Sequence, residues 1–250
     1  MYHSVLFGDK NTWDDWRLVP SSRPYVGPPE PKVEQVDIPG SDGVLDLTNA
    51  LNQFVNYKNR TGSIEFTLMN QLYAQGADAE DWEVVYSKIM NHLHGKKMTM
   101  ILEDDPLYYY YGRYRVSSFK SGNHNSTITI DYDVEPYKRN IIPNVKTASI
   151  AASYGQEEPV WTTISFASGD IGDAPIVPEF YVRLTLPPES VDPYVLFKVP
   201  GYDGYRSLWY GQSDPIIIPE MIFRKGTTDV IEIAATYAGT VTMKYNNGGL

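Results

Sequence analysis

Short runs in which apolar and polar side chains alternate recur along most of this 250-residue chain. In Arg60–Asn70, for example, Ile64, Phe66 and Leu68 lie at every second position and share one face. Alternation with a period of two is typical of a strand that buries one side. The chain is therefore expected to fold mainly as β-sheet.

Further runs of this kind predict the strands around it. A short apolar run at His3–Gly8 ends in glycine and predicts a first strand. Three more runs are Met98–Asp105, Tyr108–Phe119 and Ser126–Tyr137. The turn sequences DDPL and KSGNHN separate these three runs, and such short turns predict antiparallel pairing.

One segment, Gly76–Lys97, has helical spacing instead. Asp78 is a suitable N-cap, and Gly95 is placed to end the helix. The apolar residues at spacings of three and four are Trp82, Val85, Tyr86, Ile89, Met90 and Leu93. Residues 1–140 are therefore expected to form an α+β domain, β-rich with one helix.

The C-terminal half is predicted to be all β. The segment Lys138–Pro159 has weaker patterning, and we interpret it as a linker. Beyond it the short apolar or alternating runs are Val160–Phe166, Phe180–Leu186, Tyr194–Val199, Ser207–Gly211, Pro215–Pro219, Met221–Gly226, Asp229–Tyr237 and Thr240–Tyr245. Close spacing of short strands is typical of a β-sandwich or jelly roll, so residues 141–250 form the second expected domain.

Composition excludes several classes of function. The formal net charge is −10, and the densest basic cluster is only Gly112–Arg115, so specific nucleic-acid binding is not expected. The absence of cysteine excludes disulfides and Cys-based metal sites, and fits synthesis in a reducing cytoplasm. No run approaches the roughly 20 apolar residues of a membrane span, and the first ten residues lack the pattern of a secretion signal. We expect no membrane insertion.

The candidate catalytic groups have simpler structural explanations. Glu103–Asp105 offers paired carboxylates of the kind that glycosidases use, but the following Pro106 favours a hairpin turn. Tyr108–Tyr114 could form an aromatic platform, although alternate tyrosines of a strand face opposite sides.

The four histidines are His3, His92, His94 and His124. His92 and His94 lie two apart on the expected helix and point to different faces, so they cannot hold one metal as an i, i+4 pair can. We expect the histidines to be hydrogen-bonded or solvated. No enzyme activity, metal or cofactor is expected.

The segment Lys10–Leu47 combines large apolar residues with many prolines. Proline fixes φ and biases its predecessor away from helix, so Ser21–Lys32 should be extended, and Glu34–Leu51 should form two short strands around a turn. Such a stiff arm either docks on a partner, losing little entropy, or folds back over its own domain. The candidate interface residues are Trp13, Trp16, Pro24, Pro28, Pro29, Asp37, Ile38, Pro39 and Leu45.

Several motifs of this chain, taken in order and with their spacing, resemble the N-terminal domain of siphophage distal tail (Dit) proteins and related phage tail proteins. The most specific are KNTWDDWRLVP at Lys10–Pro20, VDIPGSDGVLDLT at Val36–Thr48, and MNHLHGKKM with LEDDP at Met90–Met98 and Leu102–Pro106. The resemblance covers roughly Val5 to Tyr137.

The resemblance implies a virion structural protein that is made in the bacterial cytoplasm and located at the tail tip of a phage or prophage. Its belt-type N-terminal domains would assemble into a homo-hexameric ring that joins the tail tube to the baseplate or adhesion apparatus and leaves a central channel for DNA. The implied partners are the tail tube protein, the tape-measure protein and tail-tip or receptor-binding proteins. In this family the second domain is often a galectin-like β-sandwich. In that context we expect the arm from Trp13 to Leu47 to pack between protomers.

Two other functions stay open on the residues alone. A carbohydrate-binding β-sandwich module would use exposed aromatic residues such as Trp161, Trp209 and Tyr210, although a sandwich core also needs large aromatics. A glycosidase would use Glu103 or Asp105.

Overall fold

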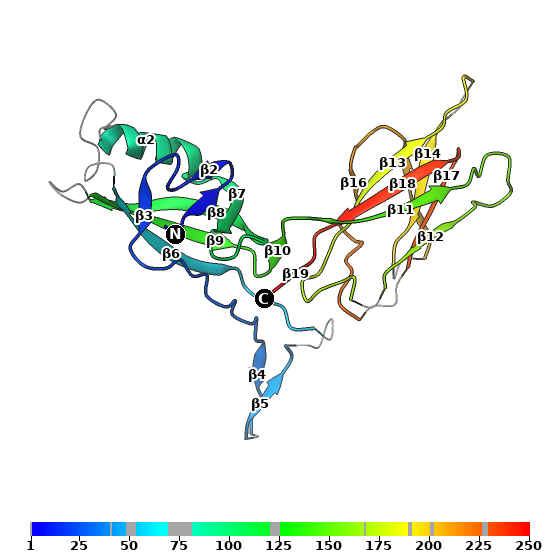
Figure 1. Ribbon diagram of the computed structural model, residues 1–250. Coiled ribbons are helices and arrows are strands. Elements are labelled where there is room, and N and C mark those ends of the chain that lie inside the picture. Colours follow the sequence, from blue (N-terminus) through cyan, green and yellow to red (C-terminus); the bar gives the residue numbers. More distant parts are fainter. Residues whose placement is uncertain are drawn as a thin grey trace. The chain divides into compact units, whose positions relative to one another are not determined.

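The computed structural model describes residues 2–40, 42–48, 54–69, 82–120, 126–167, 169–189, 192–200, 203–226 and 230–250 (Figure 1). The expectations for Asp78 and His124 lie outside these residues. The chain divides into two compact units, one of Met1–Lys138 with Leu250 and one of Arg139–Gly249. Among the described residues, the single helix belongs to the first unit and the second unit contains only strands.

The first unit is built on an antiparallel sheet with the strand order β2-β1-β7-β8-β9-β6-β3. Its strands are β1 (Val5–Phe7), β2 (Lys10–Asn11), β3 (Leu18–Pro20), β6 (Arg60–Leu68), β7 (Lys97–Leu102), β8 (Tyr108–Lys120) and β9 (Ser126–Val134). The strands expected before residue 138 are thus confirmed, and so is the antiparallel pairing of the last three.

Helix α2 (Trp82–Leu93) packs against one face of this sheet (Figure 1). Its buried residues are Trp82, Val85, Ile89 and Leu93, which confirms the expected apolar stripe. From the sheet, Ile64, Phe66 and Leu68 join the same buried cluster. Gly95 follows the helix with a φ of 75° and donates its amide to the Tyr114 carbonyl oxygen at 2.7 Å, so the helix stops where its stripe ends.

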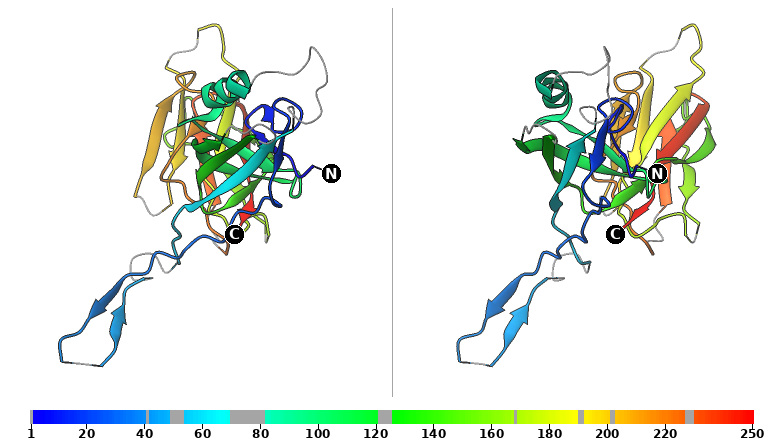
Figure 2. Two further views of the ribbon diagram at one scale, coloured as in Figure 1. Left: turned by 90° about the vertical axis from the view of Figure 1, so that its left-hand side faces the viewer. Right: turned by 60° about the vertical axis from the view of Figure 1, so that its left-hand side comes forward.

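A separate two-stranded sheet also belongs to the first unit. It consists of β4 (Gln35–Asp37) and β5 (Val44–Asp46), and no other described strand pairs with it (Figure 2). The two short strands expected around a turn are therefore present. The turn carries Gly40 and Gly43 with φ values of 82° and 89°, a conformation that glycine adopts at little cost.

The second unit contains two four-stranded antiparallel sheets. One has the order β11-β18-β13-β16, with β11 (Asn144–Ile150), β13 (Glu179–Leu184), β16 (Ile216–Ile217) and β18 (Gly239–Tyr245). The other has the order β12-β17-β14-β15, with β12 (Thr162–Ser165), β14 (Tyr194–Lys198), β15 (Tyr205–Trp209) and β17 (Val230–Ala235). Both sheets contribute side chains to one buried cluster, in which the Phe180 and Phe197 rings lie 5.0 Å apart.

A short ladder lies at the start of the second unit. Strand β10 (Lys138–Asn140) pairs with β19 (Gly248–Gly249). The Asn140 amide donates to the Asn247 carbonyl oxygen at 2.7 Å, and Asn246 Nδ2 donates to the Asn140 carbonyl oxygen at 2.7 Å. The beginning and the end of this unit are therefore hydrogen-bonded to each other.

Two expectations for this half are wrong. The interpretation of Lys138–Pro159 as a linker fails because β11 is a full strand, paired with β18 along its whole length. Its half-buried positions include Lys146, whose ammonium lies 5.5 Å from the Phe166 ring centroid and pairs with Asp170, so the strand lacks an apolar pattern. The run Met221–Gly226 forms no named strand, although Phe223 is buried and makes a bridge with Ile176.

Candidate functional site

The proline-rich arm begins as part of the main sheet. Strand β3 pairs with β6, and directly after it the Ser21 amide donates to the Glu65 carbonyl oxygen at 2.8 Å. Pro24, Val26 and Pro29 are buried. Residues 18–29, which we call the root, are therefore fixed to their own domain.

A charged contact also holds the root. Arg23 Nε donates to Asp104 Oδ2 at 3.0 Å, and His3 Nδ1 lies 2.9 Å from each oxygen of the same carboxylate. Desolvation by itself would raise the pKa of Asp104, but the hydrogen bonds from His3 and Arg23 outweigh it and lower the pKa. The ionised carboxylate thus ties the N-terminal segment and the root to the β7–β8 turn.

Arg60 lies beneath the root with 6% of its surface exposed. Its Nε donates to the Pro136 carbonyl oxygen at 2.7 Å, and its Nη1 donates to the Gly27 carbonyl oxygen at 3.0 Å. Burial lowers the pKa of the guanidinium, and Nη2 is buried with no hydrogen-bond partner among the described residues. Within the described ranges Arg60 has no carboxylate partner, and burying such a cation costs stability. Its hydrogen bond to the Gly27 carbonyl oxygen holds the backbone of the root in place.

Beyond the root the arm becomes a two-stranded ribbon. Its outgoing and returning legs are joined by the Lys32 amide, which donates to the Asn56 carbonyl oxygen at 2.7 Å, and by the Lys58 amide, which donates to that of Glu30 at 2.8 Å. Further out, β4 and β5 pair with each other. We call residues 34–47 the hairpin.

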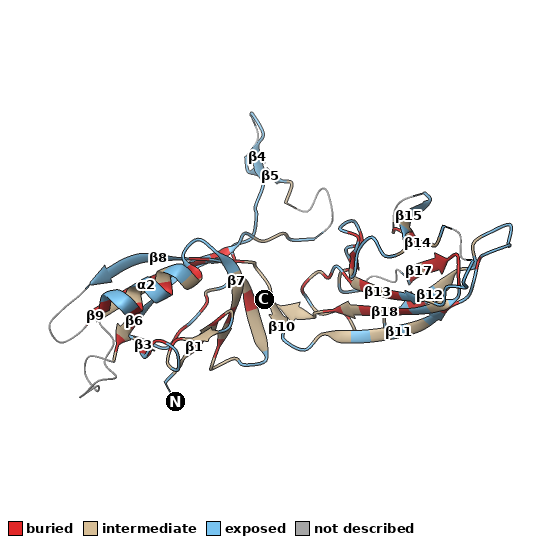
Figure 3. Ribbon diagram, turned by 90° about the horizontal axis from the view of Figure 1, so that it is seen from above, coloured by how far each residue is buried: buried red, intermediate tan, exposed pale blue. Residues whose placement is uncertain are grey.

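The hairpin leaves apolar side chains uncovered. Its register places Val36 opposite Leu45, and the exposed fractions of Val36, Ile38, Val44 and Leu45 are 47%, 45%, 49% and 47%. Every described residue from 30 to 46 is exposed, which Figure 3 shows as unbroken pale blue along β4 and β5. An isolated two-stranded hairpin is marginally stable in water, so an apolar hairpin of this kind is suited to docking on a partner.

The candidate interface residues divide between the two parts of the arm. Trp16 is 5% exposed and belongs to the core of its own unit, so it has no free face for a neighbour. Trp13 is half-buried and stacks on Tyr2 with ring centroids 3.9 Å apart, and Pro24 and Pro29 are buried. The candidates that remain exposed are Pro28, Asp37, Ile38, Pro39 and Leu45.

The sequence patterns did not identify three residues that matter for the arm, namely Val36 and Val44 in the hairpin and Arg60 beneath the root. Val36 and Val44 flank the turn. The alternation of Val36 and Ile38 with Asp37 was a usable signal for the outgoing strand, whereas Val44 lies next to Leu45 and has no such pattern. The burial of Arg60 could not be predicted, because a single arginine at the start of an alternating strand is expected to be solvated.

The acidic triplet has structural partners. Glu103 accepts hydrogen bonds from the Ser4 amide and hydroxyl at 2.7 and 3.1 Å, and the Asp105 carboxylate lies 2.7 Å from Lys138 Nζ. Together with the contacts of Asp104, these bonds occupy all three carboxylates at the turn between β7 and β8, where a turn was expected.

The described histidines also have partners. The nearest polar neighbours are Asp104 for His3, the Phe7 carbonyl oxygen at 2.8 Å for His92 and the Val116 amide at 3.1 Å for His94. Within the described ranges, no group of three or more histidine or acidic side chains could hold a metal ion. The same residues include no helix that is long and apolar enough to cross a membrane.

Comparison with known proteins supports the fold. No protein-family model matches the chain, and no curated protein matches its sequence. Among solved structures it is similar to the crystal structure of the SPP1 Dit (gp 19.1) protein, described there as a paradigm of hub adsorption apparatus in Gram-positive infecting phages, with a TM-score of 0.56. The match has 13% sequence identity and covers 99% of both chains. The fold is that of a Dit protein.

The Dit resemblance of the sequence motifs is thus confirmed at the level of the fold. Because the match extends over nearly the whole chain, it also includes the second unit, for which the sequence motifs gave little support.

Proposed function

We propose that this protein is a structural subunit of a phage tail tip, a Dit-type hub that joins the tail tube to the baseplate or adhesion apparatus. The full-length match to the SPP1 Dit fold supports the class of protein. The observation that carries the mode of action is the hairpin, whose apolar side chains are half exposed on an arm with a fixed root. The role is structural and requires neither a catalytic centre nor a cofactor.

In this proposal the hairpin of one copy covers the next copy in a closed ring. Such a contact joins two different surfaces, and a rotation that closes after a fixed number of copies prevents open-ended growth. The number six, the central channel for DNA and the galectin-like character of the second unit follow from the family resemblance. So do the further partners, which are the tail tube, tape-measure and receptor-binding proteins.

The apolar area of the hairpin is sufficient for such a role. Full burial of a Val, Leu or Ile side chain contributes about 1.5–3 kcal/mol, and Val36, Ile38, Val44 and Leu45 are each about half exposed. Covering the remaining area of these side chains would contribute on the order of 3–6 kcal/mol for each hairpin. A closed ring multiplies this contribution by the number of its contacts.

The test compares assembly of the full chain with that of a hairpin variant by native mass spectrometry and negative-stain electron microscopy. We expect the wild-type chain to form rings, alone or with the tail tube protein. Val36→Asp combined with Leu45→Lys should abolish the rings, because the interface would have to bury two charged side chains, while the opposite charges remain compatible with the pairing of these two positions in the hairpin. The far-UV circular dichroism of the variant should stay unchanged, since both positions are exposed in the single chain.

The matched control is Ile142→Asp, a charge placed at a 77% exposed apolar position of the second unit, which should leave the rings intact. A wild-type chain that stays monomeric at high concentration and with its tail tube partner would overturn the proposed ring. Rings that survive the double substitution would show that the hairpin does not hold them.

A further inference from the structure

The second unit keeps both of its tryptophans out of its core. Its buried cluster contains neither Trp161 nor Trp209, and Trp209 is 51% exposed. Tyr210, by contrast, packs against the cluster, and its hydroxyl accepts a hydrogen bond from the Leu184 amide. Core packing, which is the simplest explanation for large aromatics in a β-rich unit, therefore accounts for Tyr210 and leaves the two tryptophans without a structural role there.

The exposed aromatic rings share the outer face of the sheet β12-β17-β14-β15. Trp209 lies opposite Tyr194 in the β14–β15 ladder, and Tyr205 lies opposite Lys198. Residues directly opposite each other project from the same face of a sheet. Val195, one position from Tyr194 on β14, is fully buried, so Tyr194 and Lys198 project away from the core.

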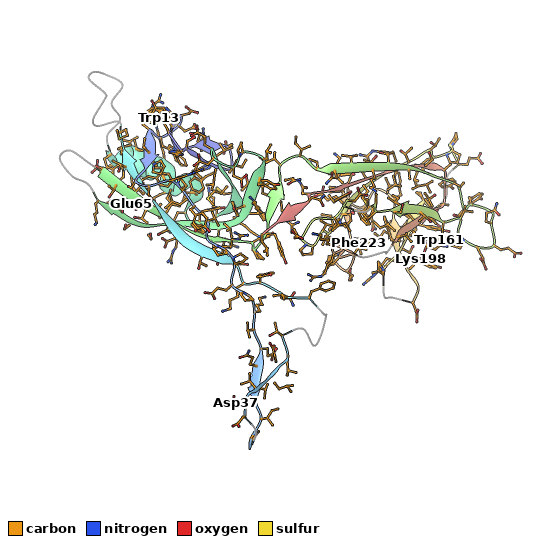
Figure 4. All side chains as sticks on the ribbon, turned by 60° about the horizontal axis from the view of Figure 1, so that its bottom comes forward. Trp13, Asp37, Glu65, Trp161, Lys198 and Phe223 are labelled. Carbon is orange, nitrogen blue, oxygen red and sulfur yellow. The ribbon has the colours of Figure 1, made fainter. Side chains whose placement is uncertain are left out.

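Polar groups are interleaved with these rings. Lys198 Nζ lies 4.6 Å from the ring centroid of Trp161 and within 3.0 Å of both carboxylate oxygens of Glu232. The rings of Trp161 and Tyr205 lie 6.0 Å apart, and Figure 4 shows Trp161 beside Lys198. A fixed ammonium–carboxylate pair next to aromatic rings can donate a hydrogen bond to a hydroxyl group and accept one from it.

A cavity of about 360 Å³ lies beside Tyr205 on this face. Tyr194, Leu196 and Ser207 line it from the sheet, and the segment that precedes Trp161 lines it from the other side. Leu196 is 3% exposed although it belongs to the outer face, so it forms an apolar floor. The volume of the cavity falls within the range of small-molecule binding sites.

The charge of the lining narrows the ligand class. Glu157 and Glu158 are exposed at the cavity, and the lining contains no lysine, arginine or histidine. A phosphorylated or carboxylated ligand would meet like charge at the cavity, and the ammonium of Lys198 on this face is already paired with Glu232. An uncharged ligand would find aromatic faces, hydroxyl groups and carboxylate acceptors.

We propose that this face binds an uncharged saccharide. A pyranose ring has an apolar face of C–H groups and a rim of hydroxyl groups, which matches exposed aromatic rings interleaved with hydrogen-bonding side chains. Tyr205 borders both the cavity and the Trp161–Lys198 cluster, and it is the expected stacking residue. The site lies wholly within the second unit and is independent of the hairpin and of ring assembly.

The experiment measures saturation-transfer NMR and titration calorimetry of the full chain with galactose, glucose and N-acetylglucosamine. Glucuronic acid serves as the anionic probe, and glucosamine and a lysine-containing peptide serve as the cationic probes. We expect at least one uncharged sugar to bind and glucuronic acid to bind more weakly. Tyr205→Ala should weaken the binding about tenfold, as the loss of one aromatic stacking partner would.

The matched control is Tyr25→Ala, which removes a 72% exposed tyrosine of the first unit and should leave sugar binding unchanged. Because Tyr205 is 51% exposed, its removal should not unfold the unit, and thermal unfolding of the variant checks this. Failure of every uncharged sugar to bind, binding that Tyr205→Ala leaves intact, or a preference for the anionic or cationic probes would each overturn the proposal. Ring assembly, measured on the same samples, would be unaffected by any of these results.

Discussion

The root and the hairpin are adjacent parts of one proline-rich arm, yet they differ in almost every physical respect. The root is paired with β6, buried at Pro24, Val26 and Pro29, and held by Arg23 and Arg60. The hairpin is exposed at every described residue from 34 to 46 and pairs only with itself among the described strands. An arm of this kind can therefore be stiff at its base and still offer an apolar surface to another molecule.

The largest expected loss of stability comes from a tryptophan at the start of the arm, and a second tryptophan three residues away should show a much smaller loss. Trp16→Ala should lower the free energy of unfolding of the first unit by about 3–5 kcal/mol, because Trp16 is buried in the core. Trp13→Ala removes a half-buried ring stacked on Tyr2 and should cost only about 1 kcal/mol. Urea unfolding followed by circular dichroism measures both. Equal losses would mean that the start of the arm is not divided between core and surface as described.

A smaller effect is expected at the residue that fixes the root. Arg60→Ala leaves the Gly27 and Pro136 carbonyl oxygens without their donor, and it also removes a buried charge that has no carboxylate partner in the described part of the chain. Because these two effects oppose each other, we expect a net loss of about 2 kcal/mol. Hydrogen exchange should show faster exchange confined to the root and its neighbours.

Lys120→Ala, at an exposed position of β8, is the control for Arg60 and should change the stability by less than about 0.5 kcal/mol. Unchanged exchange at residues 24–29 in Arg60→Ala would mean that the root is held by its other contacts alone.

The smallest expected effect is the pH dependence of stability that arises from the Asp104 contact with the root. The folded-state pKa of Asp104 is lowered, so its ionised form stabilises the native state at neutral pH. This contribution is present above the unfolded pKa of about 3.9 and is lost as the pH falls through the lower folded pKa. Asp104→Asn should therefore lower the thermal midpoint near neutral pH, and the difference from wild type should shrink below about pH 4. A difference that stays constant down to the acid limit would show that Asp104 acts through packing rather than charge.

Much of the fold was predictable because its strands bury one face. Ile64, Phe66 and Leu68 alternate as expected, and the helical stripe from Trp82 to Leu93 points to the same core. Strand β11 was missed because Lys146 takes a half-buried position, where it interacts with Asp170 and the Phe166 ring. The ion pair and the ring contact that allow Lys146 to be half-buried involve residues about 20 positions away in the sequence, so the local pattern of β11 could not reveal them.

The division of the arm could be predicted only in part. The prolines and the turn glycines predict an extended segment and a hairpin, and both are present. Which prolines are buried depends on contacts with Arg60 and Asp104, which are distant in the sequence. For the same reason, composition could not distinguish the packed Tyr210 from the exposed Trp209.

The β10–β19 ladder has a practical consequence. Because Asn140 is hydrogen-bonded to Asn246 and Asn247, the chain enters and leaves the second unit at neighbouring points. Modules with adjacent ends can be exchanged between scaffolds with short splices. Residues 141–246 are thus a natural unit for grafting, because a different binding module with adjacent ends could replace them.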